Sequence, residues 1–288
     1  MSQTLLTVAL PIALAWMMFC VGMTLRVADF ARVSQYPLKV IAALLAQLLG
    51  LPLLAYAVIT VLGLPEPVAV GLWLLALAPG GASSNAITHL SGGDSALSIT
   101  MTAISSLIIP FSMPMLVTWL MPELVLAIPL KTAILQLAAV TIVPVLLGIA
   151  LHHFAERKPW FASLTTVAGK SALWVLFFTV AITLVANTKV FHLMASMATV
   201  AAIVLCVAGM LMGALVARTL GEGSKVVKTF AIEVGIQNAG TAIFAAVVLL
   251  GRPEFAVTPL LYGVLMNIPA FALIYWHRKM QANGVCHR

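Results

Sequence analysis

The sequence contains very few charged residues. Only 8% of its 288 residues are Asp, Glu, Lys or Arg, whereas 62% are hydrophobic and the mean hydropathy is +1.13. Soluble domains have about a quarter of their residues charged, so the composition excludes that class and indicates an integral membrane protein. No ten-residue block of alternating polarity recurs, which argues against a transmembrane barrel and predicts an all-α polytopic protein.

Acidic residues are the scarcer charge, with eight Asp and Glu against fifteen Lys and Arg. The resulting net charge of +7 does not indicate a nucleic-acid partner, because the basic residues are scattered between apolar runs and form no long cluster. We therefore expect the lipid bilayer, and not a nucleic acid, as the large partner. No feature of the sequence indicates an obligate protein partner.

Motifs for catalysis are absent as well. The chain has no HExxH motif, no P-loop and no nucleophile elbow, so we expect neither an intramembrane enzyme nor a nucleotide-driven pump. Its three cysteines, Cys20, Cys206 and Cys286, are far apart and lack CxxC spacing, which predicts neither a disulfide nor a metal role.

Long apolar runs are what the sequence does contain. Each is long enough to cross about 30 Å of hydrocarbon as a helix of roughly 20 residues. The nine runs cover approximately residues 5–25, 38–62, 68–91, 95–120, 130–153, 163–186, 192–217, 226–250 and 257–276. Their short connections predict a single membrane domain over residues 1–288, and the length of the first run predicts a retained span, not a cleaved signal.

The basic residues between the runs predict the orientation. If the amino terminus is outside, twelve of the fifteen Lys and Arg lie on one side of the bilayer, and only Lys131, Lys189 and Arg252 lie on the other. Since cytoplasmic loops carry the excess of Lys and Arg, we expect an external amino terminus and a cytoplasmic carboxy terminus.

Two of the runs are interrupted. The third contains Ala78-Pro79-Gly80-Gly81-Ala82-Ser83-Ser84-Asn85, and the eighth contains Glu233-Val234-Gly235-Ile236-Gln237-Asn238-Ala239-Gly240. Paired interruptions of this kind point to inverted repeats with a binding site near the middle of the bilayer. The two runs are five spans apart, and an odd number of spans gives the repeats the opposite orientations that such a fold requires.

Glu233 is the only carboxylate inside an apolar run, and an ionisable group within the membrane is a functional-site hypothesis by default. Ser84 and Asn85 supply further oxygens, and Ser98 and Thr102 share a helix face in the fourth run. Such oxygens suit a hard monovalent cation, and we favour sodium. A proton on Glu233 is the rival. Gln47, Gln237 and Asn267 either join this polar set or bond a neighbouring helix.

The motifs together resemble those of the bile acid:sodium symporter family over essentially the whole chain. They are Met18-Phe19-Cys20-Val21-Gly22-Met23-Thr24-Leu25 followed by Asp29-Phe30, then Pro79-Gly80-Gly81 with Ser84-Asn85, and then Glu233 to Asn238. The resemblance implies a core domain with two crossing broken helices and a panel domain that moves against it. The panel would comprise the runs 5–25, 130–153 and 163–186, and the core the other six.

The resemblance also implies a set of site residues. The first sodium site would comprise Ser84, Asn85, Ser98, Thr102 and Glu233. The second would comprise Gln47, Gln237, the Glu233 carboxylate and the backbone oxygens of Val234 and Ile236. The substrate would face Ala82, Ser83, Asn238, Ala239, Gly240 and Asn267, where amide protons and positive helix ends favour an anion.

Two features depart from the family pattern. Bacterial members with ten spans have an additional first helix, so the repeat expected here is four plus five spans. Ala82 stands where a hydroxyl residue is common, which bears on the polar contacts of the substrate. Neither departure affects the sodium residues.

The sequence thus predicts a symporter of a bacterial inner membrane that uses sodium ions, two by this assignment, to import an organic anion by alternating access. A bile-acid-like molecule, a steroid sulfate and a small carboxylate such as pantoate are all compatible with the anion site. The alternatives are a proton-coupled or exchange-type carrier of the same fold, or an anion-binding membrane receptor or channel.

Overall fold

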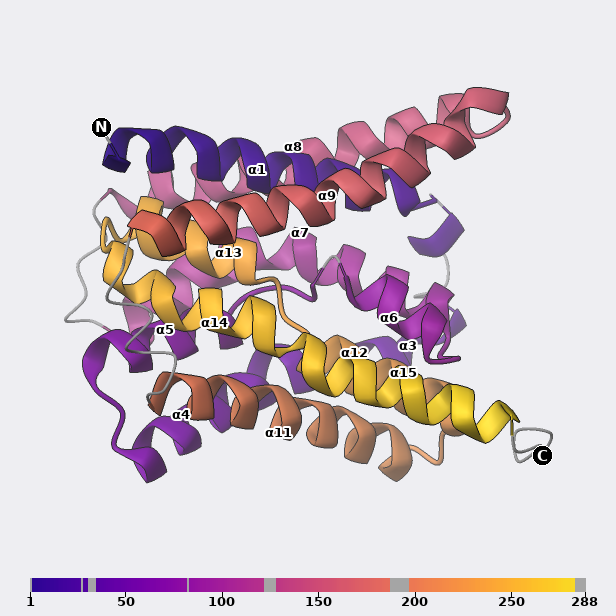
Figure 1. Cartoon of the computed structure of the whole chain (residues 1–288). Helices are drawn as coiled ribbons and strands as arrows, with labels where there is room; N and C mark the ends of the chain where they lie inside the picture. The colour runs from indigo at the N-terminus through magenta and orange to yellow at the C-terminus, as the bar shows by residue number, and fades with distance from the viewer. Residues whose placement is uncertain are drawn as a thin grey trace.

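The computed structural model describes residues 2–26, 28–30, 35–81, 83–121, 128–186 and 197–282. These residues form helices and connecting segments, and the only β-type pairing among them is an isolated bridge between Gly80 and Gln237. The prediction of an all-α protein is therefore confirmed for the described part of the chain (Figure 1). Ala82, Lys189, Cys286 and the start of the run 192–217 lie outside the described residues.

The helices follow the apolar runs closely. In chain order they are α1 (Ser2–Thr24), α3 (Pro37–Leu45), η1 (Ala46–Gly50), α4 (Leu51–Leu62), α5 (Glu66–Ala76), α6 (Ser84–Leu90), α7 (Ser95–Leu120), α8 (Leu130–Ala155), α9 (Pro159–Ala186), α11 (Met197–Thr219), α12 (Ser224–Gly235), α13 (Ala239–Phe244), η2 (Ala245–Leu249), η3 (Pro253–Ala256), α14 (Val257–Leu265) and α15 (Asn267–Ala282).

Among the described residues, five helical segments are long and apolar enough to cross a membrane. They are Pro37–Leu62, Ser95–Leu120, Leu130–Ala155, Met197–Thr219 and Pro253–Ala282, and shorter apolar helices cover Val8–Thr24, Glu66–Ala76 and Ala239–Leu249. The chain is accordingly a multi-pass membrane protein. Nine spans remains a prediction, because several of the expected spans are shorter or interrupted helices.

The third and eighth runs are interrupted where the sequence predicted. The first interruption separates α5 from α6, and the second separates α12 from α13. The two connecting segments pair with each other: the Gly81 N–H donates to Ile236 O at 2.9 Å, and the Asn238 N–H donates to Pro79 O at 2.9 Å. This pairing satisfies backbone groups that lose their helical partners inside an apolar interior.

Glycine is required where the two segments meet. A Cβ atom on Gly80 would lie 2.9 Å from Glu233 Oε2, and one on Gly81 would lie 3.1 Å from Gln237 O. Pro79, which lacks an N–H, opens the segment and cannot continue a helical hydrogen-bond ladder. Consequently α5 and α13 extend toward the end of the molecule that holds the amino terminus, and α6 and α12 toward the opposite end (Figure 1).

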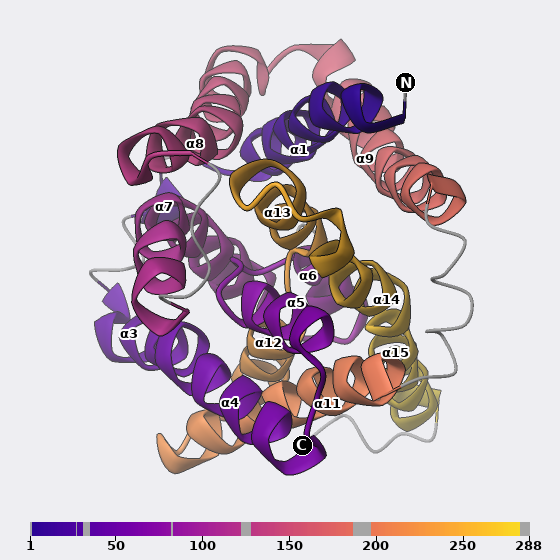
Figure 2. The ribbon, with the colours of Figure 1, turned by 90° about the vertical axis from the view of Figure 1, so that its left-hand side faces the viewer.

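Helices α1, α8 and α9 lie together on one side of the molecule (Figure 2), and α1 packs against both of the others. The approach of α1 to α8 depends on Gly22 and Gly148. A Cβ atom on Gly22 would lie 2.3 Å from Val145 O, and one on Gly148 would lie 2.5 Å from Phe19 O. Small residues allow such close contacts between membrane helices.

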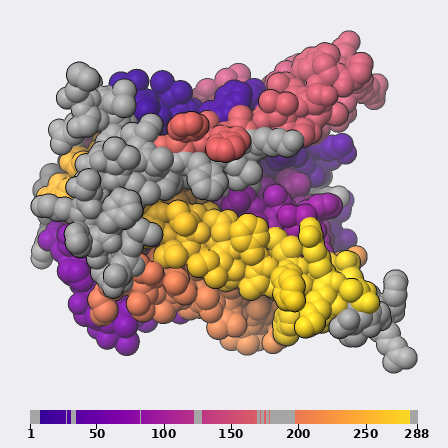
Figure 3. Space-filling model, viewed as in Figure 1, coloured from indigo at the N-terminus to yellow at the C-terminus, as the bar shows by residue number. Residues whose placement is uncertain are grey.

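The surface exposes large apolar side chains, and a few polar side chains are buried in the hydrophobic interior. Val61, Trp119 and Phe154 are 82%, 75% and 80% exposed, whereas Gln47, Ser84 and Glu233 are no more than 1% exposed. Helix α15, yellow in Figure 3, lies on this face beside the orange of α11. It carries the exposed aromatic side chains of Phe271, Tyr275 and Trp276. Exposed apolar surface of this extent indicates contact with lipid.

Candidate functional site

The candidate site is centred on Glu233, the third-last residue of α12. Its side chain is fully buried, and no Lys, Arg or His forms an ion pair with it in the part of the chain that the structure describes. A buried carboxylate is strongly destabilising unless it is paired, hydrogen-bonded or protonated. The groups around Glu233 therefore indicate what the site binds.

Three hydroxyl groups donate to the Glu233 carboxylate. Ser84 Oγ, at the start of α6, donates to Oε1 at 2.7 Å, and Thr102 Oγ1, in α7, donates to Oε2 at 2.8 Å. Ser98 Oγ, one turn before Thr102, also donates to Oε1. The four-residue spacing of Ser98 and Thr102 thus places both hydroxyls on one carboxylate.

Asn85 belongs to the same cluster. Its Oδ1 lies 2.9 Å from Ser98 Oγ and 3.4 Å from Thr102 Oγ1, and the hydroxyls of Ser84 and Thr102 are 3.4 Å apart. The structure thus brings Ser84, Asn85, Ser98, Thr102 and Glu233 together. The cluster has more oxygen lone pairs than protons, so its chemistry suits a cation that replaces water with neutral and anionic oxygens.

A second polar group adjoins the first on the other side of Gly80. Gln47, in the π-helical turn η1, donates from Nε2 to Gln237 Oε1 at 3.2 Å. Gln237 Nε2 in turn donates to Val234 O at 2.8 Å. A Cβ atom on Gly80 would lie 3.6 Å from Gln47 Nε2 and 2.9 Å from Glu233 Oε2, so the two groups are neighbours.

The carbonyl of Ile236 has a backbone hydrogen-bond donor, whereas that of Val234 accepts from the Gln237 side chain. The Ile236 carbonyl accepts the Gly81 N–H at 2.9 Å, as part of the pairing between the two interruptions. A carbonyl oxygen has two lone pairs, so this bond leaves one for a further partner. Gly235 O accepts from the Tyr262 hydroxyl and, at 3.2 Å, from Cys206 Sγ.

The residues expected to face the substrate are only partly brought together. Asn238 caps α13 by accepting the Thr241 N–H on Oδ1 at 3.1 Å, while its Nδ2 and Thr241 Oγ1 are buried and have no hydrogen-bond partner among the described residues. Ala239 is buried, and a Cβ atom on Gly240 would lie 3.7 Å from Met17 Sδ of α1. The first turn of α13 therefore faces α1.

Asn267 and Ser83 occupy different surroundings. Asn267 Nδ2 donates to Gly263 O and Val264 O, at 3.0 and 3.1 Å, and so bonds its own helix segment. Ser83 is half-buried and precedes α6. Ala82 lies outside the described residues, so the structure adds nothing on that position.

Sequence reasoning missed three polar residues close to the site. Thr88 Oγ1 accepts from Ser98 Oγ at 3.3 Å, Thr241 lies beside Asn238, and Tyr262 bonds the end of α12. Thr88 follows Ser84 by four residues on α6, so helical periodicity predicts its face. The contact of Tyr262 joins residues 27 apart and has no comparable local signal.

A fold of apolar helices around an oxygen-rich, carboxylate-centred cluster defines a class of protein, the membrane transporters that move ions or small solutes. Residues 11–193 match the Sodium Bile acid symporter family. This chain belongs to that family, and it is a transporter and not an enzyme.

Individual relatives agree with this assignment. The chain is 31% identical over 277 residues to an uncharacterized sodium-dependent transporter, YocS, of Bacillus subtilis, covering 94% of this chain and 83% of that protein. It is 30% identical to the probable sodium/metabolite cotransporter BASS1, chloroplastic, of Arabidopsis thaliana, covering 91% and 65%. It is also 30% identical to sodium/bile acid cotransporter 4 of Homo sapiens, covering 96% and 64%. The chain thus spans somewhat less than two thirds of the length of these plant and human relatives.

Proposed function

We propose that this protein is a symporter that couples the inward movement of sodium to the import of an organic anion. The observation that carries the proposal is the buried carboxylate of Glu233, which has three hydroxyl donors and no basic partner among the described residues. Membership of a sodium symporter family supports sodium as the cation.

The first of two sodium sites would comprise Ser84, Asn85, Ser98, Thr102 and Glu233. The three hydroxyls rotate their protons away from the carboxylate, so that each presents a lone pair to the ion. This rotation needs no movement of the helices, because all five side chains already lie within hydrogen-bonding distance of another member of the set.

A second sodium would bind between Gln47, Gln237, the Glu233 carboxylate and the carbonyls of Val234 and Ile236. The contacts of Gln47 with Gln237 and of Gln237 with Val234 support this assignment. Rotation of the two side-chain amides would turn their oxygens toward the ion. Glu233 would then serve both ions, which makes its carboxylate the element that couples them.

The anion would bind where α6 and α13 begin, near Ser83, Ala82, Asn238, Ala239 and Gly240, with Asn267 as a further contact. The unpartnered Nδ2 of Asn238 supports this location, because a buried amide without an acceptor favours an anionic ligand. The positive ends of two helices add to the attraction. A small carboxylate, a bile-acid-like molecule or a steroid sulfate would each supply the acceptor oxygens.

The membrane architecture forms part of the proposal. Nine spans would be arranged as an inverted repeat of four plus five, with the amino terminus outside a bacterial inner membrane and the carboxy terminus in the cytoplasm. Helices α1, α8 and α9 would form the panel domain. The proximity of Gly240 to Met17 supports a substrate site between this panel and the core, and alternating access would follow from movement of one against the other.

Sodium entry would supply the free energy for anion accumulation. Each sodium that enters down a potential of 100 mV contributes about 2.3 kcal/mol from the potential alone. Two sodium ions with one monoanion would carry net positive charge inward, so transport would be electrogenic.

The experiment uses the purified full chain. A thermal-shift screen of organic anions, with sodium and with choline in its place, identifies a substrate as an anion that stabilises more when sodium is present. Uptake of that anion into sealed proteoliposomes is then measured with an inward sodium gradient. We expect accumulation above the outside concentration in sodium and none in choline.

The variant Glu233→Ala, which we expect to insert normally, should lose sodium-dependent uptake entirely. Unchanged uptake in this variant would contradict sodium coupling through Glu233. Uptake that persists in choline at fixed pH would instead identify a proton-coupled or exchange-type carrier. Equilibration without accumulation would identify a receptor or channel.

A further inference from the structure

Polar side chains continue beyond the Glu233 cluster toward the end of the molecule at which α6 joins α7. They occur at four-residue spacing on three helices, which places each series on one helix face and advances it by about 6 Å per step. The series are Glu233 and Thr229 on α12, Thr102, Ser98 and Asp94 at and before α7, and Ser84 and Thr88 on α6.

The side chains of Ser98, Thr88 and Thr229 and the backbone N–H of Asp94 follow one another as a line of polar groups, which we call the seam. Ser98 Oγ lies 3.3 Å from Thr88 Oγ1, and the Asp94 N–H donates to Thr229 Oγ1 at 2.8 Å. Gly93 separates Thr88 from Thr229: a Cβ atom there would lie 2.7 Å from Thr88 Cγ2 and 2.9 Å from Thr229 Oγ1. Thr88 and Thr229 are thus packed so closely around residue 93 that only a glycine fits between them.

The seam is buried for most of its length. Ser98, Thr88 and Thr229 are all 0% exposed, and Ser91 Oγ, at the end of α6, is buried without a hydrogen-bond partner. Thr229 uses its proton on Lys225 O at 2.9 Å. Its oxygen lone pairs are therefore directed to other groups, namely the Asp94 N–H and any cation that enters the seam.

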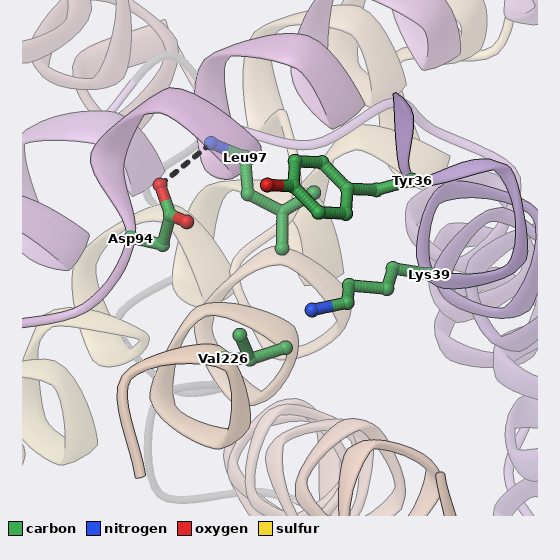
Figure 4. A pocket seen from close by; sticks show the side chains of 5 residues that line it. All are labelled: Tyr36, Lys39, Asp94, Leu97 and Val226. Atoms are coloured by element: carbon green, nitrogen blue, oxygen red, sulfur yellow. Dashed lines mark hydrogen bonds between the residues drawn. The ribbon is translucent and has the colours of Figure 1, made fainter. Parts of the chain in front are cut away.

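Asp94 connects the seam to a cavity of about 170 Å³. Figure 4 shows the cavity with its lining residues Tyr36, Lys39, Asp94, Leu97 and Val226. One carboxylate oxygen of Asp94 accepts the N–H groups of Ala96 and Leu97, and the other points toward the remaining labelled side chains. Lys39 Nζ binds Glu222 at 2.8 Å, and no ion pair with Asp94 occurs among the described residues.

We infer that this seam is the route by which the coupled cation leaves Glu233, with Asp94 as a transient binding station at the cavity. The inference rests on the proposed sodium coupling. Each hydroxyl replaces part of the hydration shell of the ion as it passes, and the carboxylate at the mouth draws the ion outward into the cavity. By the proposed orientation, the cavity opens to the cytoplasm.

Cysteine accessibility tests the route in the full chain. In a background with Cys20, Cys206 and Cys286 replaced by alanine, Thr88→Cys and Thr229→Cys are compared with Thr100→Cys. Thr100 is a matched control, because it is equally buried on α7 but bonds Asp29 O and Ala96 O, away from the seam. The probe is a small, membrane-impermeant, cationic methanethiosulfonate added to either face of sealed vesicles.

We expect both seam cysteines to react at least ~10-fold faster than Thr100→Cys. They should react only from the face of the membrane to which the cavity lined by Asp94 opens. Adding Asp94→Asn should slow the cationic reagent but not a neutral reagent of the same size, because only the local cation concentration depends on the carboxylate. Reaction at the Thr100→Cys rate, or from the opposite face, would overturn the route.

Failure of the route and failure of the proposed function have different signatures. A wild-type chain that gains no thermal stability from sodium, relative to choline, contradicts sodium coupling and with it the inference. A wild-type chain that sodium does stabilise, with seam cysteines no more reactive than the control, contradicts the route alone.

Discussion

At the scale of single residues, the site depends on hydroxyl groups whose protons and lone pairs are interchangeable. Ser84, Ser98 and Thr102 donate to Glu233 in this structure, and the same oxygens present lone pairs when the protons rotate away. A hydroxyl can therefore donate to the carboxylate in the ion-free state and coordinate the ion in the ion-bound state. A charged amine in place of a hydroxyl would form a permanent ion pair with the carboxylate and exclude the ion.

Removing one of these hydroxyls should weaken sodium binding without loss of the fold. Thr102→Val keeps the shape of the side chain but removes the donor to Glu233 Oε2. We expect the sodium concentration for half-maximal thermal stabilisation to rise ~10-fold or more, because the ion loses an oxygen ligand that valine cannot replace. Thr102→Ser, which retains the hydroxyl, should bind sodium within a few-fold of the wild type.

Thr100→Val is the control for this prediction, because Thr100 lies on the same helix and bonds backbone oxygens only. Equal sodium affinity in Thr102→Val and Thr100→Val would show that Thr102 does not contribute to the ion site.

At the scale of elements, the interruptions between α5 and α6 and between α12 and α13 create the site. Each break removes helical hydrogen bonds, and the paired segments replace some of them through Gly81 with Ile236 and Asn238 with Pro79. The π-helical turn at Ala46–Gly50 places Gln47 beside this crossing. The remaining carbonyls and helix ends stay available to ions and anions.

Gly80→Ala should disrupt the crossing. The added methyl would lie 2.9 Å from Glu233 Oε2 and 3.4 Å from Thr102 Oγ1, so the segment or the carboxylate must shift. We expect a lower melting temperature and a sodium response weakened ~10-fold, measured by thermal denaturation over a sodium series. Gly223→Ala is the matched control, since a methyl group added there would have no atom within 4 Å. A Gly80→Ala protein that matches this control would refute the assigned geometry.

At the scale of the whole molecule, helix α1 packs more closely against α8 than against α13. Gly22 and Gly148 bring the backbones of α1 and α8 together, so these two helices are well suited to move as one body. The contact of α13 with α1 is looser, because a Cβ atom on Gly240 would still lie 3.7 Å or more from Met17 and Leu14. A methyl group on Gly240 would thus be in ordinary van der Waals contact with α1, whereas one on Gly22 or Gly148 would overlap the facing backbone.

The proposed orientation predicts labelling from opposite sides. Lys225 and Arg252 are both exposed and lie at opposite ends of the helices formed by residues 224–249. In a cysteine-free background, Lys225→Cys should react with an impermeant thiol reagent only from the cytoplasmic face, and Arg252→Cys only from the outside. The reverse pattern would invert the topology, and labelling of both from one face would contradict a membrane crossing between them.

Much of the site was predictable because its signals are local. Glu233 stands out as the one acid within an apolar run, Ser98 and Thr102 share a face by spacing, and Pro79 with its glycines marks a break. The pairing of Gln47 with Gln237 joins residues 190 apart, so the sequence alone left open whether each amide bonds a helix or the site. Asn267 shows the opposite case, because in the structure it bonds its own helix.

Hydropathy and backbone chemistry act locally along the chain, so the amino-acid sequence predicts a helical membrane protein, the places where its helices break and the acid that is isolated in an apolar setting. The oxygens that surround this acid are known only from the folded structure. Ser84, Ser98 and Thr102 reach Glu233 across 131 to 149 residues of chain. That convergence depends on how α6, α7 and α12 pack, and packing is a property of the whole molecule.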